Sequence, residues 1–540
     1  MRTVADQVVS ILRGAGVQVV FGIPSVHNLG LYEALRKQPG IRHILCRHET
    51  TATHMADGYA REGRRIGVVI TSTGPGAGYT VPALQEALGS SSPVLVIATN
   101  IASAKIGKEI GTLHEVREQE DIFRTVTKGV FAVRHASDVP DMLPAALRRS
   151  RMGRPGPVYL EIPTDLLTTE AEETTRSAES AVLEPVEQNP LPDLEKAMSL
   201  LREAQHPLLL VGTAALRAGL SEQICKLAEA LTAPAIFTPN AQGMLPDDHL
   251  LALGNAARRG LIREAVLSSD LVLTLGSRLR EVDAKRRGLR LSRLIHVDWD
   301  GQWIDNNFPA EVSITGDLIK IVRALVEGCA SLPENEIRKA RVEGLAAQRR
   351  EETRLIAEKQ PELAYLEALR NAIPRTGTLI ADNTQLGYWS EYFYPSYIPG
   401  GWIGAKGSSI IGFAFAAAVG ARIAAPERPI VALIGDGGFL YSDQELSTCV
   451  RHGIGFPLIV VNSRSYEIIG YLQKKFHGHE YETRLENPDF VQLARAYGVE
   501  GRRVTSPAQL QEATKEALSM DKMWLIELVA NIPEPPFATY

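Results

Sequence analysis

The side chains best suited to chemistry follow two apolar runs in the last third of the chain. The first run, residues 429–434, ends in the sequence GDGG (residues 435–438), and the second, residues 457–461, ends in Asn462-Ser463. Continuous apolar runs are typical of parallel strands buried on both faces. If these strands are neighbours, their polar ends meet at the carboxyl edge of a sheet, where open α/β folds bind ligands. Such oxygen ligands suit Mg²⁺, and the glycine-rich backbone N–H groups suit a diphosphate.

The segment between the two runs predicts a tight turn and then a helix. Glycine-rich backbone makes a tight turn at residues 435–438. Ser442 and Glu445 form an S-x-x-E capping box, which predicts the start of a helix. Gly453 is a typical C-cap residue at the end of that helix. We therefore expect strand, turn, helix and strand in this order.

This arrangement resembles the metal–diphosphate motif of the thiamine diphosphate (ThDP) enzymes. In that family an Asp and the second residue of an Asn pair bind the metal, together with a carbonyl two residues later. The resemblance implies that Mg²⁺ is held by Asp436, by Asn462 or Ser463, and by the carbonyl of Ser465. Ser463 occupies the place of the second Asn, and a hydroxyl is a weaker ligand than an amide oxygen. The resemblance also implies cofactor contacts at the turn and just after the second strand, from Gly435, Asp436, Gly437, Gly438, Asn462 and Tyr466.

The first part of the chain contains a second candidate cofactor site. The sequence CRHETTATHMADGYAR, residues 46–61, places Glu49 between an expected strand and an expected helix. It resembles the pyrimidine-binding domain of the ThDP enzymes, in which a Glu hydrogen-bonds N1′ of the aminopyrimidine. Glu49 falls on that position. The later sequence STGPGAGYTV resembles the same domain and implies cofactor contacts from Thr73 and Gly74.

Two histidines are candidates for proton transfer near a substrate. His27 lies in FGIPSVHNL, one residue beyond the family's catalytic position, which is occupied here by the apolar Val26. His114 lies in TLHE, in a loop where other members place His or Gln near the substrate. An ordinary solvated loop histidine is the alternative reading of each. Ile469, also apolar, stands where pyruvate decarboxylases carry a second catalytic Glu.

Two further loops of the last domain resemble family loops that contact the cofactor. They are ADNTQLGYW and GAKGSSII, and they imply contacts from Asn383, Thr384, Gln385 and Ser409. Ile411 falls on the bulky apolar position that lies under the cofactor and enforces its bent shape. Ordinary core packing is the alternative role of Ile411.

The chain is too long for one hydrophobic core, and its length predicts three domains. Alternating strand and helix patterns predict an α/β fold with three doubly wound parallel-sheet domains. We expect a pyrimidine-binding domain at residues 1–170, a central Rossmann-like domain at 191–330 and a diphosphate- and Mg-binding domain at 361–540. The polar stretch 169–190 is typical of an exposed linker.

The central domain is the least informative part of the sequence. No G-x-G-x-x-G follows its first strand, so no motif supports a dinucleotide. In the ThDP family this domain holds FAD, the ADP part of coenzyme A, or nothing. Arg258, Arg259 and Arg278 could contact a nucleotide, and exposed surface arginines are the simpler reading.

Composition narrows the classes of partner. The net charge of −5 argues against nucleic acid. The four cysteines are scattered, with no C-x-x-C pair, which fits reduced thiols, a cytoplasmic location and no zinc site. The longest apolar run is too short and too interrupted to cross a membrane. The expected partners are therefore small molecules and further copies of the chain.

The resemblance implies a mechanism and a class of reaction. Glu49 shares a proton with N1′ of the cofactor, a C2 ylid forms, and its addition to a 2-oxo acid leaves an enamine after loss of CO₂. Protonation of the enamine gives an aldehyde, and attack on a second carbonyl gives a carboligation product. The expected activity is that of a non-oxidative 2-oxo acid decarboxylase or carboligase of the acetolactate-synthase-like group. A related 2-hydroxyacyl-CoA lyase, acting on an acyl-CoA, is a variant.

Two alternatives remain open from the sequence. True acetolactate synthases carry Gln, Phe-Gln and Lys in segments where this chain has Asn100, His114 and Thr164, which argues against that activity. A catalytically weak regulatory homologue is motivated by Ser463. The family also implies a homodimer at minimum, because Glu49 and Asp436 must contact one cofactor from different chains. Within the family a homotetramer is the favoured assembly.

Overall fold

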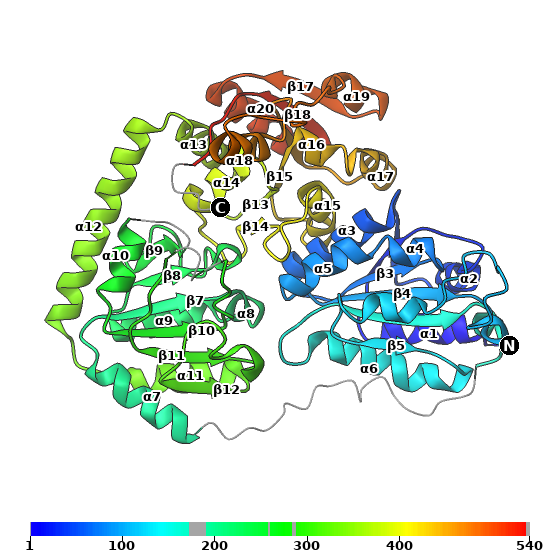
Figure 1. The fold of residues 1–540 in the computed structure, drawn as a ribbon, viewed down its shortest axis with the longest axis horizontal. Helices are drawn as coiled ribbons and strands as arrows, with labels where there is room; N and C mark the ends of the chain where they lie inside the picture. The colour runs from blue at the N-terminus through cyan, green and yellow to red at the C-terminus, as the bar shows by residue number, and fades with distance from the viewer. Residues whose placement is uncertain (1, 172–190, 257–259, 283, 285–287, 536–540) are drawn as a thin grey trace.

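The fold is seen in a computed structural model of the chain, which describes residues 2–171, 191–256, 260–282, 284 and 288–535 (Figure 1). Each of three domains contains one six-stranded sheet, and every strand pairing is parallel. This confirms the α/β class with three doubly wound parallel-sheet domains. The expected linker at 169–190 lies outside the described residues except for its first three.

The N-terminal domain has the strand order β2-β1-β3-β4-β6-β5. Its strands are β1 (Val19–Gly22), β2 (Arg42–Leu45), β3 (Gly67–Thr71), β4 (Val94–Asn100), β5 (Val130–Ala132) and β6 (Val158–Pro163). Its helices are α1 (Val4–Gly14), α2 (Leu29–Lys37), α3 (Glu49–Gly63), α4 (Pro75–Gly78), α5 (Val81–Gly89) and α6 (Val139–Arg151). The central strands β3 and β4 are buried along their whole length, as their mostly apolar or β-branched sequences predict.

The middle domain has the order β12-β11-β10-β7-β8-β9. Its strands are β7 (Pro207–Val211), β8 (Ala235–Phe237), β9 (Ala252–Asn255), β10 (Leu271–Leu275), β11 (Leu294–Asp298) and β12 (Val312–Thr315). Its helices are α7 (Leu191–Glu203), α8 (Thr213–Arg217), α9 (Ser221–Leu231), α10 (Leu261–Leu267) and α11 (Leu318–Cys329). The long helix α12 (Glu336–Lys359) then runs along this domain, against α10 and β9, toward the last domain (Figure 1).

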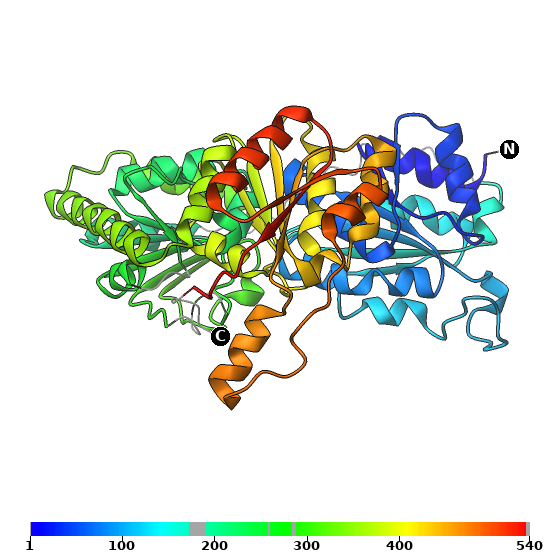
Figure 2. The ribbon, with the colours of Figure 1, turned by 90° about the horizontal axis from the view of Figure 1, so that it is seen from above.

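The C-terminal domain has the order β14-β13-β15-β16-β18-β17. Its strands are β13 (Thr378–Ala381), β14 (Trp402–Gly404), β15 (Ile430–Gly435), β16 (Pro457–Asn462), β17 (Glu500–Val504) and β18 (Trp524–Val529). Its helices are α13 (Leu363–Ala372), α14 (Gln385–Phe393), α15 (Phe413–Ala424), α16 (Asp436–Phe439), α17 (Leu446–His452), α18 (Glu467–His477), α19 (Phe490–Ala496) and α20 (Pro507–Met520). Figure 2 shows α18 as an orange helix that projects from the body of the molecule.

The N-terminal and C-terminal domains of the chain pack together through α3 and α15. The backbones of these helices approach so closely that glycine is required where they meet. A Cβ at Gly58 would lie 2.0 Å from the carbonyl oxygen of Ala417, and one at Gly420 would lie 1.8 Å from that of Met55. One hydrophobic core therefore extends from the sheet of one domain to the sheet of the other.

Two local predictions around residues 435–445 are wrong. The GDGG segment leads into one turn of helix, α16, rather than the predicted tight turn. Glycine is needed here because a side chain would clash: a Cβ at Gly437 would lie 2.5 Å from the ring of Tyr466. The predicted capping box does not form either. The Ser442 side chain makes no cap hydrogen bond, and the carboxylate of Glu445 accepts instead from residues of the N-terminal domain. A tertiary contact has replaced the local one.

Candidate active site

Glu49 is the first residue of α3, and its side chain lies against the glycine-rich turn α4. A Cβ at Gly76 would lie 3.3 Å from Oε1 of Glu49. Burial raises the pKa of Glu49 above its usual value, and the neighbouring His48 partly offsets this shift. A carboxyl group with a raised pKa holds or shares a proton more readily than an ordinary carboxyl group, which is the direction expected of this residue.

His27 and His114 lie side by side at the same edge of the N-terminal sheet. Their ring centroids are 4.9 Å apart, and Nδ1 of each ring is buried without a hydrogen-bond partner among the described residues. Burial, and then the neighbouring His114, lower the pKa of His27. Unpartnered buried nitrogens are rare, and here they mark a place where a ligand or water can bind.

The glycine-rich turn meets the loop that carries His114. Gly74 has a φ of 59°, and a Cβ there would lie 2.4 Å from the carbonyl oxygen of His114. The N–H of Gly74 donates to the side chain of Gln119, and the hydroxyls of Thr73 and Thr99 share a hydrogen bond of 2.9 Å. The Thr73 hydroxyl is therefore engaged inside the domain, and its predicted contact with a cofactor remains a prediction.

Asp436, Ser463 and Ser465 lie together at the carboxyl edge of the C-terminal sheet. Oδ2 of Asp436 accepts from the N–H of Arg464 at 2.6 Å, which places the 463–465 segment beside it. The Ser463 hydroxyl donates to the carbonyl of Ser465 at 3.3 Å. A carboxylate, a hydroxyl and a carbonyl oxygen are therefore adjacent, as a hard cation requires.

Asn462 lies deeper than its neighbours. Its Nδ2 donates to Glu527 at 2.7 Å, and its Oδ1 accepts from Nδ2 of Asn487 at 3.0 Å. Of the two candidate side-chain ligands, Asn462 thus has both ends of its amide hydrogen-bonded to other side chains, whereas Ser463 hydrogen-bonds to the carbonyl of Ser465, the predicted third ligand.

The sequence reasoning missed two residues of this group. Asn487 donates to Asp436 at 2.8 Å as well as to Asn462, and its Oδ1 is buried without a partner. Glu467 hydrogen-bonds to Ser463, and burial together with the nearby Asp436 raises its pKa to about 7. Glu467 follows the predicted contact Tyr466 and could have been considered, whereas nothing in the sequence places Asn487 here.

Two loops of the C-terminal domain complete the surroundings. Nδ2 of Asn383 donates to the carbonyl of Ser409 at 2.9 Å, so the two loops adjoin. Gln385 begins α14, and its Oε1 is buried without a hydrogen-bond partner. Ser409 has a φ of 58°.

The predicted contacts Thr384 and Ile411 border the start of α16. A Cβ at Gly435 would lie 3.2 Å from Cβ of Thr384, and one at Gly438 would lie 3.5 Å from Cγ1 of Ile411. The structure thus gathers the C-terminal candidates around the GDGG segment. Its oxygen ligands, its unpartnered buried Gln385 and Asn487 oxygens, and its glycines without side chains fit a metal-bound diphosphate cofactor.

Comparisons with known proteins identify the family. The thiamine pyrophosphate enzyme N-terminal TPP binding domain matches residues 2–122, the central domain matches 194–325, and the C-terminal TPP binding domain matches 382–528. A probable 2-ketoarginine decarboxylase of Pseudomonas aeruginosa is 33% identical over 97% of this chain and 94% of its own length. The chain belongs to the thiamine pyrophosphate enzyme family.

Other relatives carry the name of acetolactate synthase. The large subunit of Haemophilus influenzae is 30% identical over 98% of this chain and 94% of its own length, and a probable large subunit of Methanocaldococcus jannaschii is 29% identical over 98% and 92%. The protein is therefore a thiamine pyrophosphate-dependent enzyme of the acetolactate synthase and 2-oxo acid decarboxylase group. None of the helices in the described residues is long and apolar enough to span a membrane.

A polar pocket lies between the N-terminal and middle domains of this thiamine pyrophosphate enzyme. Cationic side chains line it, together with the strand ends of the middle sheet: Arg154, Arg278, Arg280, Lys406, Thr213, Thr238, Gly276 and Asp298. Burial raises the pKa of Asp298 to about 6. Of the three arginines considered for a nucleotide, Arg278 lines this pocket, and Arg258 and Arg259 lie outside the described residues.

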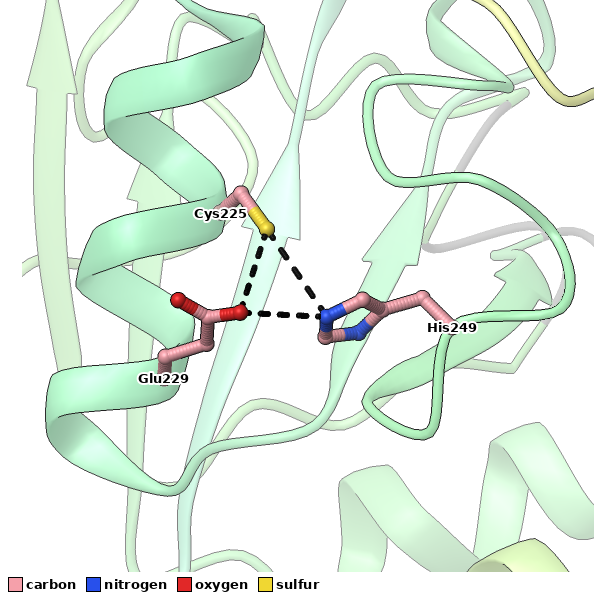
Figure 3. A group of neighbouring side chains, drawn as sticks. All are labelled: Cys225, Glu229 and His249. Carbon is pink, nitrogen blue, oxygen red and sulfur yellow. Dashed lines mark hydrogen bonds and ion pairs between the residues drawn. The ribbon is translucent and has the colours of Figure 1, made fainter.

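A group of metal-type side chains lies elsewhere on the middle domain, where Cys225, Glu229 and His249 point toward one another (Figure 3). Oε1 of Glu229 is 3.3 Å from Nε2 of His249 and 3.7 Å from Sγ of Cys225. Nδ1 of His249 accepts from the N–H of Leu251 at 3.2 Å, so Nε2 carries the ring proton and donates it to Glu229. A metal-bound histidine instead donates from its other ring nitrogen. The arrangement is that of a hydrogen-bonded surface group, and we assign no metal to it.

Proposed function

We propose that this thiamine pyrophosphate enzyme is a non-oxidative 2-oxo acid decarboxylase that can also act as a carboligase. The observation that carries this proposal is the pair of imidazoles, His27 and His114, at the edge that also presents Glu49. A decarboxylase must deliver a proton to the carbon that loses CO₂, and a pair of neighbouring histidines, one buried and one half-buried, each with a buried Nδ1, is suited to deliver it. The cofactor, when bound, supplies the electron sink.

Each candidate residue then has a role in this proposal. Glu49 would share a proton with the pyrimidine ring of a bound cofactor, because burial raises the pKa of its carboxyl group. Asp436, Ser463 and the carbonyl of Ser465 hold Mg²⁺, and Asn487 orients the Asp436 carboxylate. Ile411, beside the GDGG segment, shapes the floor under the cofactor.

The apolar residues on the substrate side of the site support a 2-oxo acid with an uncharged side chain. The relative from P. aeruginosa is named as acting on 2-ketoarginine. In this chain Val26 and Ile469 are exposed apolar residues that flank the candidate positions. We therefore propose an aliphatic or aromatic 2-oxo acid ahead of a cationic one.

Acetolactate synthase is the second candidate, favoured by the names of several relatives. Of the three positions that argue against it, His114 belongs to the histidine pair, and the other two make contacts within the N-terminal domain. Asn100 donates to the buried Glu161, and the Thr164 hydroxyl donates to the carbonyl of His27 at 2.7 Å. The pocket beside Arg154 and Arg278 is where a nucleotide such as FAD or ADP would bind in this chain, and bound FAD would favour the synthase.

One experiment separates these functions. The purified enzyme with ThDP and Mg²⁺ is given a panel of 2-oxo acids, and both CO₂ and organic products are measured. We expect CO₂ together with the corresponding aldehyde for at least one aliphatic or aromatic acid. Release of CO₂ from pyruvate with acetolactate as the sole product would identify the synthase instead.

We also propose that the active unit is at least a homodimer with shared sites. Within the described chain the hydrogen bonds of Asp436 come from the C-terminal domain alone, and Glu49 lies among N-terminal residues. One cofactor must contact both, and a two-fold axis brings the two edges of different chains together.

The four free cysteines support a cytoplasmic location.

A further inference from the structure

Glu445 is a fully buried carboxylate of the C-terminal domain that accepts hydrogen bonds from the N-terminal domain of the same chain. It precedes α17, and its oxygens accept from the backbone N–H groups of Arg47 at 3.0 Å and His48 at 3.2 Å. The hydroxyls of Thr51 and Thr448 also donate to it. All the acceptor capacity of this side chain is directed at the junction between β2 and α3 and at the first turn of α17.

This arrangement is more than packing between domains. A buried carboxylate costs free energy unless hydrogen bonds satisfy it, and here three of the four donors lie within two residues of Glu49. The end of α17 holds the same junction, because Nε2 of His452 accepts from the N–H of Leu45 at 3.0 Å. The backbone that carries Glu49 is therefore held from outside its own domain at residues 45, 47 and 48.

We propose that Glu445 is a positioning residue that fixes the direction in which Glu49 presents its carboxyl group to the cofactor. The inference rests on the proposed role of Glu49. Because α17 follows α16, the same segment connects Glu49 with the Asp436 turn of its own chain. In a dimer with shared sites, Glu49 and Asp436 of one chain belong to different active sites. Glu445 therefore connects the two active sites through the chain that contributes to both.

The test measures exchange of the C2 proton of bound ThDP by NMR, with ThDP affinity measured in parallel by calorimetry. Four proteins are compared: the wild type, Glu445→Gln, Glu49→Gln and the double variant. A displacement of about 1 Å at a reacting group costs about 10²-fold in rate, so we expect Glu445→Gln to slow exchange by about this factor with ThDP affinity unchanged. In the Glu49→Gln background the same substitution should have no further effect, because residues that act as a unit are not additive.

The outcomes separate the inference from the proposal beneath it. The positioning role would be overturned if Glu445→Gln exchanged the C2 proton at the wild-type rate. It would also be overturned if Glu445→Gln slowed exchange by the same factor in the wild-type and Glu49→Gln backgrounds. Wild-type exchange in Glu49→Gln would overturn the proposed role of Glu49 itself. Ser442→Ala is the matched control, because it alters the same segment without touching the junction, and it should exchange normally.

A second variant keeps the test valid if Glu445→Gln fails to fold. Thr51→Val removes one donor to Glu445 and keeps the shape of the side chain. We expect it to slow C2 exchange by a smaller factor, again only when Glu49 is present. Exchange at the wild-type rate in this folded variant would contradict the inference.

Discussion

Ser463 stands where the resemblance to the ThDP enzymes implies an Asn, and its hydroxyl is a weaker neutral ligand than an amide oxygen. We predict that Ser463→Asn binds Mg²⁺ about 10-fold more tightly in the presence of ThDP, a gain of about 1.4 kcal/mol. Calorimetric titration of Mg²⁺ measures this directly. Asp436→Ala should abolish binding in the same assay.

Ser465→Ala serves as the control for this prediction. It removes a hydroxyl that donates to Thr483 and keeps the carbonyl that is expected to bind the metal. Its affinity for Mg²⁺ should stay at the wild-type value. Weaker binding by Ser463→Asn would show that the amide does not reach the ion and that the Ser463–Glu467 hydrogen bond serves the site better.

Single residues also show where sequence reasoning succeeds and where it ends. Asp436 and Ser463 were predictable because each follows a buried strand, and parallel strands align their carboxyl ends. Asn487 was not, because it lies in a loop whose path depends on the whole domain. Thr73 shows a third case: its position at the site was predictable, but its hydroxyl turns to Thr99, and spacing alone does not give that direction.

At the scale of elements, the interface between helices α3 and α15 contains a buried histidine whose protonation depends on pH. His54 of α3 is fully buried, its ring packs edge-on against Phe413, and in the part of the chain that the structure describes neither ring nitrogen has a hydrogen-bond partner. Burial lowers its pKa to about 4 from 6.5. The unfolded chain therefore takes up a proton as pH falls below about 6.5, and the folded chain does so only near 4.

We predict that the enzyme loses stability between pH 6.5 and 4 and that His54→Leu removes part of this loss. One such proton contributes a slope of up to about 1.4 kcal/mol per pH unit within the window and nothing above it. Urea unfolding at pH 7 and pH 5 measures the slope in both proteins. His43, whose pKa burial also lowers to about 4, contributes equally to both, so the difference isolates His54. An unchanged slope in His54→Leu would contradict the prediction.

Elements also explain why the predicted capping box failed. Ser442 and Glu445 have the right spacing, and every element around them was expected in the right order. Local spacing predicts a cap only where no stronger partner competes for the carboxylate. Two backbone N–H groups at the end of β2 and the hydroxyl of Thr51 are such partners, and they come from a domain almost 400 residues away in the sequence.

At the scale of the whole molecule, the shared-site model makes a prediction that no single variant can test. Glu49→Gln and Asp436→Ala should each be inactive alone. When the two proteins are mixed under conditions that allow chains to exchange, a mixed dimer contains one doubly altered site and one native site. Activity should therefore return, toward about half of the wild-type value per mixed dimer.

The control for this mixture is exchange between two Glu49→Gln preparations, which should remain inactive. Mass spectrometry of differently labelled chains establishes that exchange has occurred. Confirmed exchange without recovered activity would mean that each cofactor is held within one chain. ThDP should also favour the dimer, because a ligand stabilises the state that binds it.

The glycine contacts between α3 and α15 have a consequence for how this enzyme can be altered by recombination. Chimaeras are usually joined at linkers, on the assumption that each domain folds on its own surface. Here Gly58 of the N-terminal domain and Gly420 of the C-terminal domain fit against the backbone of the opposite helix. A foreign N-terminal domain with a larger residue at position 58 therefore cannot pack on this C-terminal domain, and a foreign C-terminal domain with a larger residue at position 420 cannot pack on this N-terminal domain. The first and last domains should therefore be inherited together.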